Sequence, residues 1–519
     1  MASATDANKS AVTLTSAPGK VLVVGGYLVL ERNYSGLVVG TDASLYAAVQ
    51  EQNIASSDVD SSAATKGVTI LVVSPQFTSA WWKYVFNTES NKLEQTSSAD
   101  GSKNGFVQVV LEVTLSLVSH YSADSLKYFS AQTLNEGQSA PKGLKVVLSA
   151  DNDFYSQRGT LAKMGLDLSS ESLRRLPRMC ETGTRLQDVH KTGLGSSAAM
   201  VTSLVASIFV HFGVVTSPIQ SLDRCTDAES KRGLLLIHNV AQFAHCLAQG
   251  KVGSGFDVSA AVFGSHVYCR FAPAVIKDVM GENQTVADIA KAVSPDNPGW
   301  NSVVGSVDIP PRFLLRLADV DTGSNTPSMV KKVLHWQETH PEEAKLLWNA
   351  LDAANNQIRA IWTSLGVTYI KDAAEYNQTF DWCSMHKSSE WKSAPELSKS
   401  PTLGLLCDLV EEIRRVRSFQ RELGRNAGVP IEPPEQTKLL DACMEVPGVC
   451  MAAVPGAGGY DAIYCVTLGR GPSKDVENLW SRWKSMSVGP LLANQTSSGV
   501  RVLDADAFPE ILAILNASS

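Results

Sequence analysis

Two glycines and two serines stand directly before the most apolar stretch of the chain, in the segment Lys191–Ala199 (Lys-Thr-Gly-Leu-Gly-Ser-Ser-Ala-Ala). Apolar residues then recur every four positions from Met200 to Phe212, which predicts a buried helix. Glycines let backbone N–H groups approach a ligand, and a helix N-terminus offers unpaired N–H groups with a partial positive charge. The segment therefore suits a phosphate chain, and its hydroxyls suit a phosphate oxygen or Mg²⁺.

The same residues are equally consistent with a glycine turn that ends in a serine N-cap and binds nothing. The Walker pattern G-x-x-x-x-G-K-[ST] is absent from this segment. The chain also lacks H-E-x-x-H and a convincing G-x-S-x-G, so metalloprotease and serine-hydrolase chemistry have little support. The histidines His190, His238 and His245 are accordingly interpreted as structural or surface residues.

Four other loops carry polar residues beside apolar segments. Ser16–Lys20 ends in a lysine before a strand pattern, and Lys251–Asp257 ends in a carboxylate before an apolar stretch. Val454–Asp461 is rich in glycine, and Asp319–Pro327 follows a strand candidate. Each segment alone also fits a structural role. In the same order, these roles are a solvated lysine, an aspartate N-cap, a turn, and a cap for a helix that begins at the proline.

Composition narrows the class of protein. The chain has 519 residues and a net charge of −7, which does not support general binding to nucleic acids or anionic membranes. Its nine cysteines are scattered without C-x-x-C pairs, as expected for reduced thiols inside a cell. The start of the chain has no apolar core of the signal-peptide type, and the stretch 200–215 is short and interrupted for a bilayer span. We therefore expect a soluble cytoplasmic protein, with organelle import through an internal signal as the alternative.

The chain is predicted to mix strands and helices, with a domain boundary near residues 283–300 and a helix-rich second half. Gly424 is the expected end of the last long helix. Strands are expected at 21–24, 27–30 and 313–317, and helices at 106–118, 233–247, 327–336, 342–365 and 403–419.

Taken together, the loops resemble the motifs of the GHMP small-molecule kinases, in that family's chain order. Ser16–Lys20 is similar to its first motif, Gly193–Ala199 to its phosphate loop and Pro455–Gly459 to its third motif. Four longer segments resemble the fungal and plant branch whose acceptor is (R)-5-phosphomevalonate. These segments are Ala17–Glu31, Lys191–Met200, Ala244–Gly264 and Ala318–Pro327.

The resemblance implies an α+β fold of two domains. Residues 1–290 would form a ribosomal-S5-domain-2-like domain, and residues 291–519 a ferredoxin-like domain with helical insertions. ATP, with Mg²⁺, and the small-molecule substrate would lie in the cleft between them. The implied reaction converts ATP and (R)-5-phosphomevalonate to ADP and (R)-5-diphosphomevalonate, a step of the mevalonate route to isoprenoids and sterols. No nucleic acid, membrane or obligate protein partner is implied.

The resemblance also assigns roles to residues. Lys20 and Asp257 match the catalytic lysine and aspartate, and Ser197 matches a Mg²⁺ ligand. The phosphate loop would comprise Gly193, Leu194, Gly195, Ser196, Ser197 and Ala198. The acceptor would lie near Tyr27, Ser254, Ser324 and Thr326, and the third motif would close over the phosphates with Gly456, Ala457, Gly458 and Gly459.

One position departs from the family pattern. Many relatives have a metal-binding glutamate about three helical turns before the catalytic aspartate. Here the nearest equivalents are His245 and Cys246, so the second Mg²⁺ ligand is unassigned. The role of Asp257 is also open, between a general base and a group that orients Lys20 and the metal.

Other activities remain as alternatives. A related kinase would phosphorylate an alcohol such as mevalonate or a sugar, and a decarboxylating relative would also release CO₂. A binding or regulatory protein on the same fold would bind nucleotide without turnover.

Overall fold

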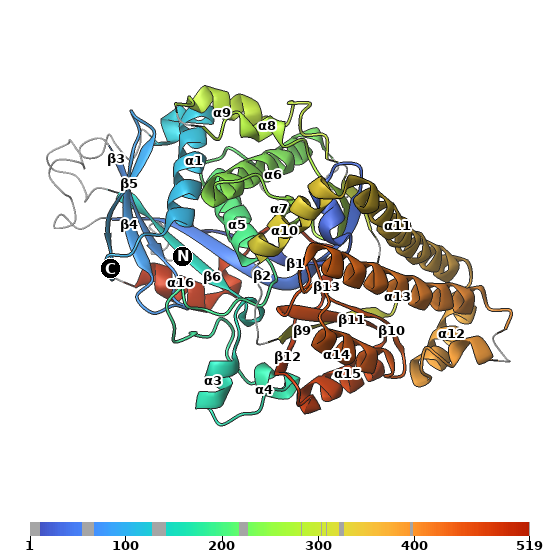
Figure 1. The fold of residues 1–519 in the computed structure, drawn as a ribbon. Helices are drawn as coiled ribbons and strands as arrows, with labels where there is room; N and C mark the ends of the chain where they lie inside the picture. The colour runs from blue at the N-terminus through green and yellow to red at the C-terminus, as the bar shows by residue number, and fades with distance from the viewer. Residues whose placement is uncertain are drawn as a thin grey trace, which may run out of the picture.

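The computed structural model describes residues 11–53, 67–126, 142–216, 227–281, 283–302, 304–307, 309–320, 326–394 and 398–517. Over these residues the chain forms two β-sheets, both packed against helices (Figure 1). No helix in the described part of the chain is long and apolar enough to span a bilayer.

The larger sheet contains ten of the described strands. Its main path runs β14-β1-β2-β6-β3-β4-β5, while β13 and β7 also pair with β2, and β8 pairs with β7. Among the described pairs only β3 and β6 run parallel. The strands are β1 (Thr13–Val24), β2 (Ser35–Asn53), β3 (Gly67–Val73), β4 (Trp81–Asn87), β5 (Lys92–Ser98), β6 (Lys142–Ala150), β7 (His266–Cys269), β8 (Val304–Ser306), β13 (Gln495–Thr496) and β14 (Arg501–Leu503).

Side chains alternate between the two faces of the sheet along each strand, and apolar residues occur on both faces. Helices therefore cover both faces. Helices α1, α5, α6 and α7 build the core on one face, with α9 packed against α1 and α6. On the other face, Tyr46, Ala48 and Val147 pack against Ile511 and Leu515 of α16. The bounds are α1 (Gly105–Tyr121), α5 (Ser196–His211), α6 (Ala228–Gln249), α7 (Phe256–Phe263), α9 (Val286–Val293) and α16 (Pro509–Asn516); the short helices are α3 (Arg158–Lys163), α4 (Ser170–Arg174) and α8 (Ala274–Lys277).

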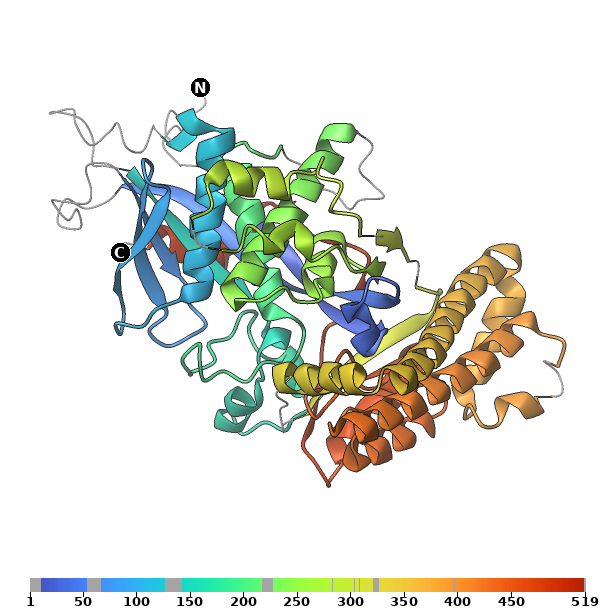
Figure 2. The ribbon, with the colours of Figure 1, turned by 45° about the horizontal axis from the view of Figure 1, so that its top comes forward.

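The smaller sheet is antiparallel and has the order β10-β11-β9-β12. Its strands are β9 (Phe313–Val320), β10 (Val449–Ala453), β11 (Ala462–Leu468) and β12 (Val488–Leu491). The long helices α11 and α13 run side by side next to it (Figure 2). The helices of this half are α10 (Thr326–Thr339), α11 (Pro341–Lys371), α12 (Ala373–Met385), α13 (Pro401–Ala427), α14 (Pro434–Met444) and α15 (Arg470–Arg482).

The second strand expected near the N-terminus is wrong. Residues 21–24 lie in β1 as predicted, but β1 begins at Thr13, so Ser16–Lys20 is part of the strand and not a loop before it. Gly26–Leu30 forms a short 3₁₀ helix, η1. Gly25 and Gly26 have φ angles of 126° and 51°, which take the chain out of the strand. A Cβ on Gly25 would lie 2.8 Å from the Gly36 Cα. The apolar residues after the glycines are buried by this turn instead of by strand pairing.

The expected end of the last long helix is also wrong. α13 continues past Gly424 to Ala427, and Gly428 ends it in the left-handed conformation with φ of 63°. Gly424 is a packing position, because a Cβ there would lie 2.7 Å from the carbonyl oxygen of Val429.

The proposed division at residues 290 and 291 stays a prediction. Strands from both sides of that point share the larger sheet, because β8 pairs with β7, β13 with β2 and β14 with β1. The last described helix, α16, also packs on this sheet. The end of the chain thus returns to the sheet that its beginning forms.

The two glycines of α13 give opposite predictions for substitution by alanine. Gly424→Ala should destabilise the protein by roughly 1–3 kcal/mol because the Val429 carbonyl must move. Gly404→Ala, with nothing within 4 Å of the new methyl group, should stabilise it by about 0.5–1 kcal/mol through helix propensity. Thermal unfolding of both variants tests this, and equal shifts in Tm would contradict it.

Candidate active site

Strand β1 holds the phosphate loop through Lys20. The backbone N–H of Lys20 donates to the Leu194 carbonyl at 2.9 Å, and its Nζ donates to the Gly193 carbonyl at 2.8 Å. The pairing of β1 with β2 shifts register between Pro18 and Lys20, so this part of the strand departs from regular pairing. The loop is therefore fixed to the strand by both the main chain and the side chain of the lysine.

The phosphate loop ends at the N-terminus of α5. Gly195 is the N-cap residue, with a left-handed φ of 82°, and no described side chain caps the helix. The serine-cap alternative is therefore wrong, because Ser196 and Ser197 are already helical. The first N–H groups of a helix have no partner within it and suit an anion. A Cβ on Gly195 would lie only 3.0 Å from the Lys20 Cε.

Helix α7 begins in the same way and carries Asp257. Its N-cap is Gly255, with a left-handed φ of 86°, and Asp257 is its second residue. The alternative that Asp257 is an N-cap is therefore also wrong; its Oδ1 accepts the N–H of Val258 at 3.0 Å. A Cβ on Gly255 would lie 2.8 Å from the Tyr268 hydroxyl, which explains why glycine occupies this position.

Ser197 and Asp257 approach each other through a histidine of α6. The Nε2 atom of His245 lies 3.1 Å from the Ser197 Oγ and 4.0 Å from the Asp257 Oδ2. His245 is 3% exposed. The sequence alone predicts a structural or surface role for this histidine, and only its position before Asp257 in the family pattern points toward the site.

The third glycine loop lies against β1 and η1 although it is far away in the sequence. The N–H of Gly456 donates to the Leu22 carbonyl at 3.2 Å, and the Tyr27 hydroxyl donates to the Ala457 carbonyl at 3.0 Å. Gly459 donates its N–H to the Ile431 carbonyl at 2.8 Å. The loop is therefore fixed between the first strand and the segment that follows α13.

A buried ion pair supports that segment. The carboxylate of Glu432, next to Ile431, is fully buried and accepts from Arg417 at 2.8 Å and from Arg421 at 2.7 Å. Thr437 adds a hydrogen bond at 3.0 Å. A buried carboxylate with several donors is held in one position.

A cavity of about 210 Å³ lies where these loops meet. Most of the predicted site residues line it, and Thr326 contributes the first residue of α10. Ser324 falls outside the described residues. The predicted residues that line the cavity are Lys20, Tyr27, Gly193, Leu194, Ser254, Thr326, Gly456, Ala457 and Gly458.

A second cavity of about 330 Å³ lies on the other side of the phosphate loop. Ser196 and Ser197 line this cavity, together with aromatic residues that include Trp82, Phe106 and Tyr155. Lys20 and Ser197 therefore face different cavities, and the loop between them forms a shared wall. Ala198 is buried beneath the loop, and Gly459 supports the third loop from outside the smaller cavity.

Burial and two carboxylates act in opposite directions on Lys20. Burial lowers the pKa of its ammonium group below the ordinary value of 10.5, while Asp257 and Asp461 oppose that shift. Asp461 also lines the smaller cavity, and the sequence reasoning assigned it no role although it ends the third glycine loop. The lysine is thus a half-buried cation that interacts with carboxylates from two distant segments.

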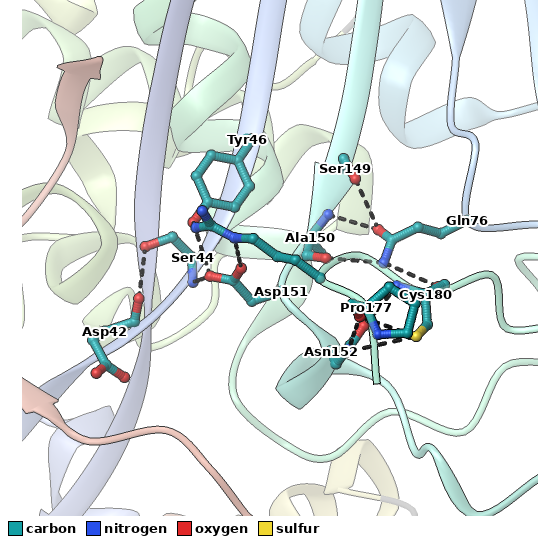
Figure 3. A network of polar contacts seen from close by, with 11 residues as sticks. Asp42, Ser44, Tyr46, Gln76, Ser149, Ala150, Asp151, Asn152, Pro177 and Cys180 are labelled. Carbon is teal, nitrogen blue, oxygen red and sulfur yellow. Dashed lines mark hydrogen bonds and ion pairs between the residues drawn. The ribbon is translucent and has the colours of Figure 1, made fainter. Parts of the chain in front are cut away.

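A polar network anchors the segment that carries Tyr155 (Figure 3). The Asp151 carboxylate accepts from the Ser44 N–H at 2.8 Å and from the Tyr46 hydroxyl at 2.9 Å. The Gln76 side chain binds both backbone groups of Ala150, at 2.6 and 2.9 Å. These bonds fix the end of β6, from which the chain enters the wall of the second cavity.

Asp319 connects the smaller sheet to the segments around the start of the phosphate loop. Its carboxylate, 4% exposed, lies 3.2 Å from the Arg158 guanidinium and 3.0 Å from the His190 Nε2. Asp319 lies near the end of β9, and His190 directly precedes Lys191. This buried contact fixes the smaller sheet relative to the start of the phosphate loop.

The donor set fits a magnesium ion that is bound largely by phosphates. No group of three or more His, Cys, Asp or Glu side chains suited to a metal occurs among the described residues. The Ser197 hydroxyl and the Asp257 carboxylate, however, both lie within 4.0 Å of one ring nitrogen. Mg²⁺ commonly uses one or two protein oxygens and completes its shell with phosphates and water.

Comparisons with known proteins identify relatives of this chain. The sequence family described as "GHMP kinases C terminal" matches residues 408–487. The peroxisomal phosphomevalonate kinase of Arabidopsis thaliana is 36% identical over 514 residues, covering 95% of this chain and 96% of its own. Phosphomevalonate kinase erg8 of Aspergillus fumigatus is 36% identical and covers 87% of this chain and 86% of its own.

Solved structures confirm the expected fold class, an α+β fold of the GHMP kinase type. The Streptococcus pneumoniae phosphomevalonate kinase, in complex with phosphomevalonate and AMPPNP, has a TM-score of 0.51 and 12% sequence identity. The alignment covers 93% of this chain and 99% of that one. The Lin0012 protein from Listeria innocua has a TM-score of 0.59 at 14% identity, over 95% of this chain and all of the other.

Two glycines of the third loop form a matched pair for substitution. Gly456 and Gly458 have φ angles of 62° and 71°, so alanine at either position should add roughly 1–2 kcal/mol of left-handed strain. Only Gly458→Ala also meets a neighbour, because its Cβ would lie 2.2 Å from the Ile431 carbonyl oxygen. We expect Gly458→Ala to lower Tm clearly more than Gly456→Ala. Equal losses would show that the contact with Ile431 does not constrain the loop.

Proposed function

This chain belongs to the GHMP kinase family, in its phosphomevalonate kinase branch, and on that premise we propose that it transfers the γ-phosphoryl group of ATP to (R)-5-phosphomevalonate. The products are ADP and (R)-5-diphosphomevalonate, a step of the mevalonate route to isoprenoids and sterols. The observation that carries the proposal is the pair of cavities on either side of the phosphate loop, with Lys20 lining the smaller one and bonded to the loop.

The two cavities divide the substrates between them. The larger one, which has aromatic side chains and the N-terminus of α5, suits a nucleotide base and its phosphates. The smaller one, lined by Lys20, Ser254 and the third loop, suits the phosphorylated acceptor. In this arrangement the acceptor phosphate meets the end of the ATP chain beside the Lys20 ammonium group.

Mg²⁺ would be held by the Ser197 hydroxyl and the Asp257 carboxylate, and it would neutralise charge on the ATP phosphates. The chain's own residues then position the reactants. The helix N-termini of α5 and α7 direct partial positive charge toward the site. Lys20 supplies a full positive charge next to the phosphate loop.

Asp257 acts mainly by orienting Lys20 and the metal in this proposal. A phosphomonoester has a second pKa of about 6 and is mostly a dianion at neutral pH, so its oxygen needs little deprotonation. The harder step is to bring two anions together. Fixed cations should therefore contribute more than a general base.

A cytoplasmic location is also a proposal for this chain. The cysteines that the structure describes are all free thiols, which suits a reducing compartment. The Arabidopsis relative is named as a peroxisomal enzyme. Microscopy of the tagged chain distinguishes a cytoplasmic location from targeting to peroxisomes.

The acceptor assignment is tested by ADP release from purified protein with Mg-ATP. We expect turnover with 5-phosphomevalonate and at least about 100-fold lower kcat/KM with mevalonate or a sugar, because an unphosphorylated acceptor lacks the charged group that Lys20 faces. CO₂ release with diphosphomevalonate would instead identify a decarboxylating enzyme. Nucleotide binding without acceptor-dependent ADP release would identify a regulatory protein.

The lysine and the aspartate should differ in their contribution to turnover. Lys20→Met removes a fixed cation and should lower kcat by roughly 100-fold or more, at least as much as Asp257→Asn. Steady-state kinetics with thermal unfolding as a folding check measures both. A loss in Asp257→Asn that clearly exceeds the loss in Lys20→Met would indicate that Asp257 is the general base.

The pH dependence should report the charge of Lys20. Its ammonium group is charged below its lowered pKa, so kcat/KM should fall as the pH rises through a value below 10.5. In Lys20→Arg this basic limb should move to higher pH, since a guanidinium stays charged up to about pH 12. A basic limb at the same pH in both proteins would assign it to another group.

A further inference from the structure

His245 lies where the phosphate loop, α6 and the catalytic aspartate meet. Its Nε2 atom lies 3.1 Å from the Ser197 Oγ, 3.0 Å from the Gln249 Nε2 and 4.0 Å from the Asp257 Oδ2. The ring is 3% exposed and lies beside Phe106, at 6.0 Å between centroids. A side chain this buried keeps its hydrogen bonds fixed.

The Gln249 contact determines which way the Ser197 hydroxyl points. An amide nitrogen can only donate, so the Nε2 atom of His245 accepts, and the ring carries its hydrogen on Nδ1. With no hydrogen on Nε2, the Ser197 hydroxyl can only donate to it, and the serine and the Gln249 amide share the single Nε2 lone pair in a three-centre hydrogen bond. The Asp257 oxygen, at 4.0 Å, is too far away to share a hydrogen bond with the ring.

This orientation gives Ser197 a defined chemistry. With its hydrogen directed at His245, the oxygen keeps its lone pairs for the cavity and offers no hydrogen to a phosphate. A lone pair without a competing hydrogen is what a hard divalent cation requires of a hydroxyl ligand. The alternative open at the level of the sequence, that Ser197 donates a hydrogen bond to a phosphate oxygen, would need the hydroxyl to turn away from the ring.

We infer that His245 is a positioning residue that makes Ser197 a metal ligand by accepting its hydroxyl hydrogen. It acts through Ser197 and contacts neither substrate. The inference rests on the proposed function only because it assumes that ATP binds together with a divalent cation. It does not depend on which acceptor the enzyme phosphorylates.

The test measures how strongly Mg²⁺ increases nucleotide affinity. Calorimetry with a non-hydrolysable ATP analogue, with Mg²⁺ and with EDTA, gives two dissociation constants whose ratio is the metal coupling. His245→Met removes the acceptor at similar volume, and His245→Gln restores a side-chain oxygen acceptor on the same straight-chain shape. The matched control is His238→Met, a buried histidine of the same helix whose Nδ1 contacts Asn239 and not Ser197.

We expect His245→Met to reduce the metal coupling roughly 10- to 100-fold, as for the loss of a partner that orients a metal ligand, while the affinity in EDTA changes little. His245→Gln should recover most of the coupling, and His238→Met should keep it. Ser197→Ala should lose the coupling as well, and Ser197→Ala combined with His245→Met should lose no more than Ser197→Ala alone.

Three results would overturn the inference: wild-type coupling in His245→Met, an equal loss in His245→Gln, or losses from Ser197→Ala and His245→Met that multiply. If His245→Met does not fold, wild-type coupling in Ser197→Ala or lost coupling in His245→Gln still overturns it. The measurement contains no acceptor. Failure of the acceptor assay would therefore reject the proposed function and leave this result standing.

Discussion

The backbone of β1 is the constraint on which the site depends. Over a few residues it binds the phosphate loop through the Lys20 N–H and the third loop through the Leu22 carbonyl. The next carbonyl, that of Val23, accepts the Tyr464 hydroxyl at 2.7 Å. The loops that form the smaller cavity therefore share one reference strand, and glycine is needed where they approach it, because a Cβ on Gly195 would press on Lys20.

The electrostatics of the site favours the close approach of two anions, ATP and the phosphorylated acceptor. Two helices begin at left-handed glycines and direct their N-termini to the same region, and a half-buried lysine interacts with two carboxylates. Placing these groups in a partly buried site strengthens their fields, because less water screens them. Phosphoryl transfer depends mainly on such positioning and on charge neutralisation. The fold therefore supplies fixed charges and dipoles, and this chemistry needs no protein nucleophile.

The sequence predicted local elements well where periodicity alone decides them, as in α5, α6 and β9. It failed where packing between distant segments decides. The apolar residues after Gly26 have the sequence pattern of a strand, yet the turn at Gly25 makes them helical. Gly424 resembles a helix end, yet it is a contact point with Val429. Serine and aspartate at helix starts resemble caps, yet glycines occupy both cap positions.

The sequence by itself determined the chemical parts: a glycine-rich loop before a buried helix, a lysine before the first predicted strand segment and an aspartate at a second glycine loop. Only the tertiary structure decided how they are used. It placed a cavity on each side of the phosphate loop, brought Asp461 to Lys20, and set His245 against Ser197. The physical reason is that local periodicity fixes an element and its buried face. Contacts such as that of Tyr27 with Ala457, 430 residues apart, arise only from how the elements pack.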